Sequence, residues 1–211
     1  MDAANVLFTD LRPALETITT LLSQTVFPQA AAEGVQLHHD GNNHWLASST
    51  VSIPGLPPGV HVFNSIRGDL SLLFKRQLAQ KYSSLAGDDG VLTVRLVPVC
   101  KQTNSYDCGL YAIANCAEVL FGSDPSKVVF DPEAVRPHLR SCFVSNKLQR
   151  FPSKRKQGKP AIVKTLLLRL TDFEESSTTG SFSSGQSVFK MGPRNPGRPK
   201  GKPQLNFNKK K

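Results

Sequence analysis

A cysteine followed by an apolar run places the strongest constraint on how this chain folds. The stretch QTNSYDCG, residues 102–109, leads into LYAIANCAEVLF, residues 110–121, whose apolar residues recur at helical spacing. We expect a helix over residues 109–121. Its buried side should comprise Leu110, Ile113, Ala114, Ala117 and Leu120 or Phe121.

Four other stretches have the alternation or composition of strands. VQLHHD and HWLASSTV are separated by GNN, which suits a tight turn, so residues 35–51 should form a hairpin. VHVFNS, from residue 60, and LTVRLVPV, from residue 92, are further strand candidates.

Three further helices are expected. LRPALETITTLLSQTVF, residues 11–27, repeats leucine and isoleucine at helical spacing, and DLSLLFKRQLAQKY, from Asp69, places Leu70, Leu73, Phe74 and Leu78 on one stripe. Asp131 is a good cap for a third helix, although Pro137 should distort or shorten that helix. Strands bracketed by helices predict an α+β domain over residues 1–150.

The charge of the chain is divided sharply near residue 150. Residues 1–149 hold 11 Lys and Arg against 13 Asp and Glu, whereas residues 150–211 hold 15 against 3. Residues 151–211 also lack the apolar density needed to offset chain entropy, so we expect a basic, largely disordered tail. Within it, AIVKTLLLRL, residues 161–170, has the composition of a short helix or strand. The basic runs suit nuclear import, weak nucleic-acid binding or simple solvation.

The N-terminal sequence MDAANVLFTD carries acids and has no basic segment followed by an apolar one. It does not resemble a signal peptide, and no apolar run approaches the length of a membrane span. We therefore expect an intracellular protein, in the nucleus or cytoplasm, without a membrane partner. Its four cysteines should be thiols, and the lack of a CxxC pair argues against a structural zinc site.

Cys108 is the one cysteine with a physical reason to be reactive. In the first turn of a helix, unpaired backbone N–H groups and the helix dipole favour the thiolate. Cysteine is also among the residues most often buried in a core, and this is how we interpret Cys100, Cys116 and Cys142.

A nucleophilic cysteine needs a base, and His44 is the best-placed histidine in the sequence. It begins a strand whose alternation puts His44, Leu46 and Ser48 on one face. His38, His39 and Asp40 suggest a metal site, but adjacent strand residues point to opposite faces, so we expect neither a metal nor a cofactor. His61 and His138 show no partner.

The order of these residues resembles a known family. GNNHW, then a strand ending in FNS, then a glutamine six residues before DCG, is similar to the Ulp/SENP-type cysteine proteases specific for ubiquitin-like proteins. Their pattern is His-Trp, an aspartate at the end of a V-Y-D-S-like strand, Gln and D-C-G. The resemblance runs from about Leu11 to Phe151.

The resemblance implies the Ulp-type fold, a central mixed or antiparallel sheet flanked by helices, and a role for each matching residue. Cys108 would be the nucleophile and His44 the general base. Gln102 would supply a side-chain N–H to the oxyanion hole together with the backbone N–H of Cys108. Trp45 and Gly109 would line the substrate channel, where Gly109 leaves room for a substrate backbone.

The chain departs from the family at two places. Asn64 stands where the family has its orienting aspartate, and an asparagine can hold an imidazole without stabilising the imidazolium by charge. We therefore expect reduced activity. The sequence ahead of the hairpin is also short for such a domain, so it resembles a truncated member. Asp107, next to the nucleophile, should fix the loop.

The implied function is thiol-dependent cleavage after the C-terminal glycine of a SUMO-like or ubiquitin-like modifier, by precursor processing or deconjugation. The alternative is a weakened or inactive relative that binds a ubiquitin-like protein or nucleic acid. A papain-like protease is excluded by chain order, since its cysteine precedes its histidine.

Overall fold

A mixed six-stranded sheet forms the centre of the structure, a computed structural model that describes residues 16–17, 33–66, 68–157 and 162–173. The strands run in the order β1-β2-β3-β4-β5-β8. Their bounds are β1 Glu16–Thr17, β2 Gly34–His39, β3 Trp45–Ser49, β4 Val60–Phe63, β5 Val91–Val97 and β8 Lys164–Arg169. The β1–β2 and β4–β5 pairs are parallel, and the β2–β3, β3–β4 and β5–β8 pairs are antiparallel.

The predicted hairpin is confirmed by β2 and β3. Leu37 lies opposite Ala47, and the loop closes through a hydrogen bond from Asp40 N to His44 O of 2.9 Å. Gly41 and Asn43 have φ of 81° and 66°, a left-handed conformation that these two residue types adopt at low cost. The GNN sequence therefore sets the turn that delivers His44 to the start of β3.

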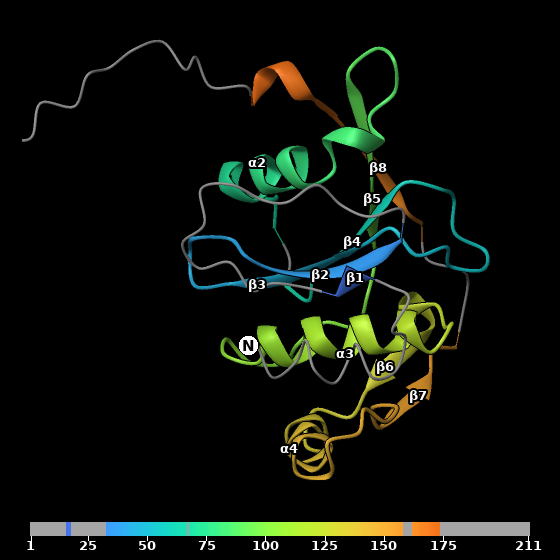
Figure 1. Ribbon diagram of the computed structural model, residues 1–211. Coiled ribbons are helices and arrows are strands. Elements are labelled where there is room, and N and C mark those ends of the chain that lie inside the picture. The colour runs from blue at the N-terminus through green and yellow to red at the C-terminus, as the bar shows by residue number, and fades with distance from the viewer. Residues whose placement is uncertain (1–15, 18–32, 67, 158–161, 174–211) are drawn as a thin grey trace, which may run out of the picture. The chain divides into compact units, whose positions relative to one another are not determined.

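Helices cover both faces of the sheet (Figure 1). Helix α2, Leu72–Lys81, packs Phe74 and Leu78 on one face, and helix α3, Cys108–Leu120, packs on the other. Alternation along β3 divides the two cores, with Leu46 in the α2 core and Ala47 in the α3 core. Helix α2 is capped by Ser71, whose Oγ accepts from Phe74 N at 3.1 Å, and so begins after the expected Asp69.

Helix α3 is buried more completely than the sequence pattern predicts. Leu110 and Ile113, expected on its buried side, are only half-buried, whereas Asn115 and Glu118 are buried. The reason is that α3 lies between the sheet and helix α4, Val135–Ser145 (Figure 1). The helix must bury polar side chains as well as apolar ones.

The prediction that Asp131 caps helix α4 is wrong, because the cap position is Ala134. Pro137, expected to distort or shorten the helix, lies in its first turn. Helix α4 begins at Val135, after a turn in which Asp131 O accepts from Ala134 N and Val135 N, both at 3.1 Å. Pro137 is consequently the third helical residue. Its missing N–H falls among the first-turn groups that have no partner inside a helix.

The folded part continues past residue 150. Strand β7, Ser153–Arg155, pairs with β6, Val128–Phe130, in a separate two-stranded sheet. The sequence predicts either a helix or a strand within residues 161–170, and Lys164–Arg169 form strand β8. This strand extends the main sheet beside β5. Three short 3₁₀ helices, Ser83–Leu85, Pro125–Lys127 and Leu170–Asp172, complete the elements described.

The N-terminal helix predicted over residues 11–27 is described only at Glu16–Thr17. These two residues form a strand parallel to Gly34–Val35, so the helix prediction is wrong there. The rest of that prediction, and most of the predicted tail, lie outside the described residues.

The fold is thus a mixed α+β arrangement of two sheets and three α-helices within the described ranges, which belong to a compact unit, Met1–Glu175. None of these helices combines the length and apolar character needed to cross a bilayer.

Candidate active site

His44 and Asn64 meet at one end of the sheet. His44 directly precedes β3 and Asn64 directly follows β4, and because these strands are antiparallel the two residues are neighbours. His44 Nε2 lies 2.9 Å from Asn64 Oδ1. Ile66 N also donates to Oδ1, at 3.0 Å, which identifies that atom as the amide oxygen.

This contact sets the tautomer of the imidazole. An amide oxygen only accepts hydrogen bonds, so Nε2 of His44 must carry the proton that it donates to Asn64. The neutral ring then has an unprotonated Nδ1. That nitrogen is the one able to take a proton from a thiol.

Gln102 is bonded to the residue that follows Asn64. Gln102 N donates to Ser65 O at 3.0 Å, and Ser65 Oγ donates to Gln102 Oε1 at 2.6 Å. Gln102 Nε2 donates to Asn104 O at 2.7 Å. These contacts fix the amide and leave its second N–H to donate to a ligand.

Lys101 strengthens the same connection. Its Nζ donates to Asn64 O at 2.9 Å and to Ile66 O at 2.7 Å. Side chain and main chain of residues 101–102 thus hold residues 64–66 at both ends. These hydrogen bonds hold Asn64, the partner of His44, in position.

The loop ahead of Cys108 is closed by Asn104 and Asp107. Asn104 Oδ1 accepts from Asp107 N at 2.9 Å, and Asn104 Nδ2 donates to Asp107 Oδ2 at 2.6 Å. The other carboxylate oxygen of Asp107 forms an ion pair with Arg136 of α4. Asp107 is therefore bonded within the loop and to α4, in keeping with its expected role, and does not bond His44.

Cys108 is the first residue of α3, and its surface is 5% exposed. Asp107 precedes it at the cap position, but the Asp107 side chain makes no capping hydrogen bond to the first turn. The N–H groups at the start of α3 are thus not occupied by the usual side-chain cap. They are suited to receive a negative oxygen.

Trp45 and Gly109 bring the beginnings of β3 and α3 together. A Cβ built on Gly109 would lie 3.7 Å from Trp45 Cδ1. Trp45 adjoins His44 and Gly109 adjoins Cys108, so the start of α3 packs against the residue next to His44. No hydrogen bond joins Cys108 Sγ to the His44 ring within the described ranges, and catalytic contacts often tighten only when substrate binds.

Hydrogen bonds, adjacency in the chain and the packing of Trp45 beside Gly109 together form a closed circuit. It passes from His44 to Asn64, through Ser65 to Gln102, along the loop to Cys108, and back through Gly109 and Trp45 to His44. All six residues singled out from the sequence belong to it: His44, Trp45, Asn64, Gln102, Cys108 and Gly109. Widely separated segments thus meet at one end of the sheet.

Sequence reasoning missed the residues that support this circuit. Ser65 is the last residue of the FNS stretch used in the sequence comparison, so of these residues it lies nearest to a recognised motif. Asn104 precedes a turn and suits a side-chain hydrogen bond to the backbone two or three residues on. Lys101 and Arg136 give no signal, since their partners lie far away in sequence.

The other cysteines and histidines have structural surroundings. Burial raises the pKa of the Cys116 thiol, which keeps it protonated. His38 Nε2 lies 2.7 Å from Ser48 Oγ, and burial lowers the pKa of His38 to about 3. The ring of His39 packs on Trp45. Across the described ranges, no three His, Cys, Asp or Glu side chains are grouped to hold a metal ion.

In comparison with known proteins, no family model matches the chain, and neither the curated proteins nor the solved structures contain a match.

Proposed function

We propose that the chain is a thiol-dependent peptidase or isopeptidase of the Ulp type, which cleaves after the C-terminal glycine of a ubiquitin-like modifier. The main support is the circuit that joins His44, Asn64, Gln102 and Cys108 at one end of the sheet. These residues supply a base, its orienting partner, an oxyanion donor and a nucleophile.

The reaction is an acyl transfer in two steps. His44 Nδ1 takes the thiol proton, and the Cys108 sulfur attacks the glycine carbonyl carbon. The tetrahedral oxyanion accepts hydrogen bonds from N–H groups of Gln102 and Cys108, and the leaving amine departs with the proton held by His44. Water, deprotonated by His44, then attacks the thioester carbon, which releases the glycine carboxylate and the thiol.

The burial of Cys108 supports a glycine at the cleavage site. With only 5% of this residue exposed, an acyl group that reaches the sulfur must be slender. A glycine tail has no side chain to exclude. The contact between Trp45 and Gly109 lies beside this approach and would narrow it further.

Asn64 is the feature that favours the second candidate, a weakened relative that binds a ubiquitin-like protein without efficient cleavage. A neutral amide orients His44 but gives the imidazolium no charge partner. Binding of a modifier without acyl transfer to Cys108 would identify this second function.

A panel of probes tests the proposal. Ubiquitin, SUMO and other ubiquitin-like proteins with a C-terminal electrophile are incubated with the wild-type chain, Cys108→Ala and the control Cys100→Ala. We expect one class of probe to label the wild type and Cys100→Ala but not Cys108→Ala. Labelling that persists in Cys108→Ala, or no labelling by any probe, would contradict the proposed activity.

A further inference from the structure

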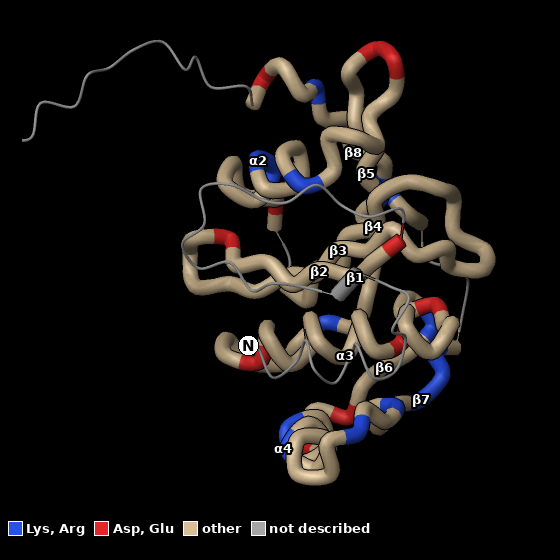
Figure 2. Tube along the Cα trace, in the orientation of Figure 1, with Lys and Arg blue, Asp and Glu red and all other residues tan. Residues whose placement is uncertain are grey.

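Positive charge is concentrated in one part of the folded region. Residues 127–157 contain eight Lys and Arg against two Asp and Glu, whereas residues 33–126, without Arg67, contain five against eight. Figure 2 shows the basic residues gathered along α4, β7 and the segment between them. We call this surface the α4–β7 face; its exposed cations are Lys127, Arg136, Arg140, Lys147, Arg150, Lys154, Arg155 and Lys156.

Most of these cations have no acidic partner among the described residues. Three are paired: Lys127 with Asp124, Arg136 with Asp107, and Arg150 with Glu118. The remaining five form no ion pair within the described part of the chain, and they are Arg140, Lys147, Lys154, Arg155 and Lys156. The surplus charge is therefore available to a ligand.

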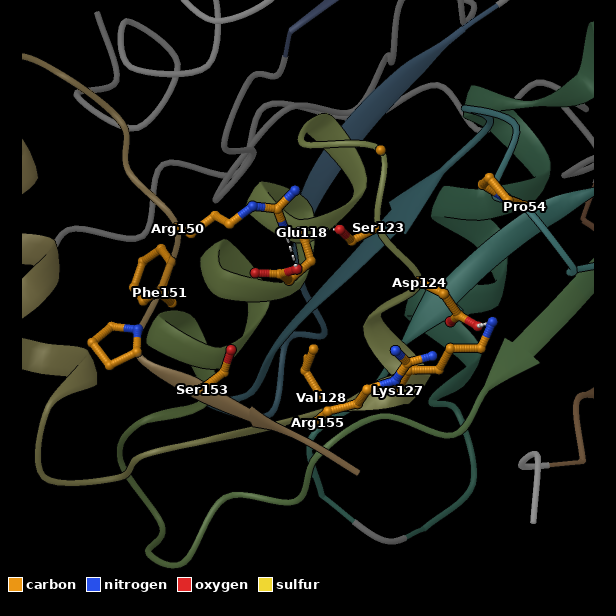
Figure 3. Close-up of a pocket in the computed structure, with 12 residues that line it drawn as sticks. Pro54, Glu118, Ser123, Asp124, Lys127, Val128, Arg150, Phe151, Ser153 and Arg155 are labelled. Carbon is orange, nitrogen blue, oxygen red and sulfur yellow. Dashed lines mark hydrogen bonds and ion pairs between the residues drawn. The ribbon is translucent and has the colours of Figure 1, made fainter. Parts of the chain in front are cut away.

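A pocket of about 670 Å³ opens in this face (Figure 3). Arg150 and Phe151 lie on one side of it, and Lys127 and Arg155 lie on the other. Hydroxyls of Ser123 and Ser153 also line it. So do the carboxylates of Glu118 and Asp124, which pair with Arg150 and Lys127 and leave Arg155 as the lining cation with no ion pair among the described residues. Cationic groups, hydroxyls and an apolar wall are the chemistry that holds a phosphate and the sugar attached to it.

We propose that the α4–β7 face binds nucleic acid through its phosphates, with Arg155 contacting a phosphate at the pocket. Lys154 and Arg155 lie in β7 and Lys156 follows it, so three exposed cations occupy consecutive residues. Successive side chains of a strand point to opposite faces, and of these three only Arg155 lines the pocket. The two lysines add positive charge beside it, which attracts the phosphates of a nucleic-acid strand.

Exposed lysines on an edge strand also have a structural use. β7 belongs to a sheet of two strands, and charge on such an edge prevents pairing with another chain. Protection of the edge explains the charge on β7 without any ligand, whereas a phosphate site predicts that loss of these cations weakens nucleic-acid binding. Two variants that lose the same number of charges, one at β7 and one elsewhere, distinguish the two explanations.

The test measures fluorescence anisotropy of labelled oligonucleotides, single-stranded RNA and double-stranded DNA in parallel arms, with the full chain over a range of salt concentrations. The test variant is Arg155→Gln/Lys156→Gln. The matched control is Lys164→Gln/Arg169→Gln, which removes two exposed cations from β8. Thermal unfolding of each variant shows whether the fold is retained.

The test variant should bind several-fold more weakly in at least one arm. Its plot of log affinity against log salt should be less steep by about 1.4 to 1.8, because about 0.7 to 0.9 is lost for each phosphate contact. The control should match the wild type. Equal losses in the two variants, or no binding in either arm, would overturn the proposal.

Polyglutamate serves as the competing polyanion. If it displaced the oligonucleotide at equal charge concentration, the face would accept any anionic polymer and the assignment to nucleic acid would be wrong. Cys108→Ala should bind the oligonucleotides as the wild type does, so this result is independent of the proposed peptidase activity.

Discussion

His44 Nε2 lies 2.9 Å from Asn64 Oδ1, and this pair joins the start of β3 to the end of β4. The amide holds the imidazole in the tautomer with an unprotonated Nδ1. It carries no charge, so it cannot stabilise the protonated ring that the proposed reaction forms. The most direct test of the site is to restore that charge.

Replacing Asn64 with aspartate should raise the rate at which Cys108 reacts with an electrophile-tipped modifier. A charged acceptor strengthens the hydrogen bond to the imidazolium by about 1 kcal/mol, which corresponds to roughly a five- to tenfold increase. Asn64→Ala, which removes the acceptor, should react more slowly than the wild type. Labelling rates of the three proteins measure this, and a slower Asp variant would contradict the role assigned to Asn64.

Gln102→Ala should lower turnover with little change in substrate binding. Loss of one oxyanion donor reduces kcat by about 10²- to 10³-fold, because that hydrogen bond forms mainly in the transition state. Steady-state kinetics on a modifier with a fluorogenic C-terminal amide separate kcat from KM. An unchanged kcat would remove Gln102 from the oxyanion hole.

Ser65→Ala tests whether Gln102 needs its support. The variant loses the 2.6 Å hydrogen bond to Gln102 Oε1, so the hydrogen bond from Nε2 to Asn104 O alone holds the amide. We expect a smaller decrease in kcat than Gln102→Ala produces, about tenfold. In the double variant Ser65→Ala/Gln102→Ala, the serine substitution should have almost no further effect. Independent, multiplicative effects would show that Ser65 acts elsewhere.

Arg150→Met should destabilise the protein more at pH 8 than at pH 5. Burial raises the pKa of the Glu118 carboxyl, and Arg150, 2.9 Å from it, offsets part of this increase. Because the pKa of Glu118 is higher in the folded state, its contribution to stability is fully present below the unfolded pKa of 4.5. That contribution is lost as the pH rises through the folded pKa. Without Arg150 the ionised carboxylate stays buried without its partner.

Arg150→Met should lower the free energy of unfolding by about 2 kcal/mol at pH 8. Urea unfolding at pH 5 and pH 8 measures this decrease. Adding Glu118→Gln to Arg150→Met removes the charge and should recover much of the stability at pH 8. A loss that does not vary with pH would show that Arg150 stabilises through its contacts with Phe121 and Ser123 instead.

Local sequence patterns predict a helix, strand or turn well where residues close together in the chain determine it. The turn residues between β2 and β3 and the apolar stripe of α2 each act over a few residues, and both predictions are confirmed at the level of the element. The helix prediction that failed at Glu16–Thr17 depends on a more distant partner, because these residues pair with β2. The start of α4 is moved by a neighbouring turn, Asp131–Ala134, which places Pro137 in the first turn of the helix.

The sequence by itself determines the residue types of the candidate site: a cysteine at a helix start, a histidine after a tight turn, and an amide six residues before the cysteine. These follow from chain order and spacing. Only the tertiary structure decides that Ser65 holds Gln102, that Lys101 spans Asn64 and Ile66, and that Arg150 pairs with the buried Glu118. Each of these contacts joins residues more than thirty positions apart, and their distance is set by how the sheet and helices pack.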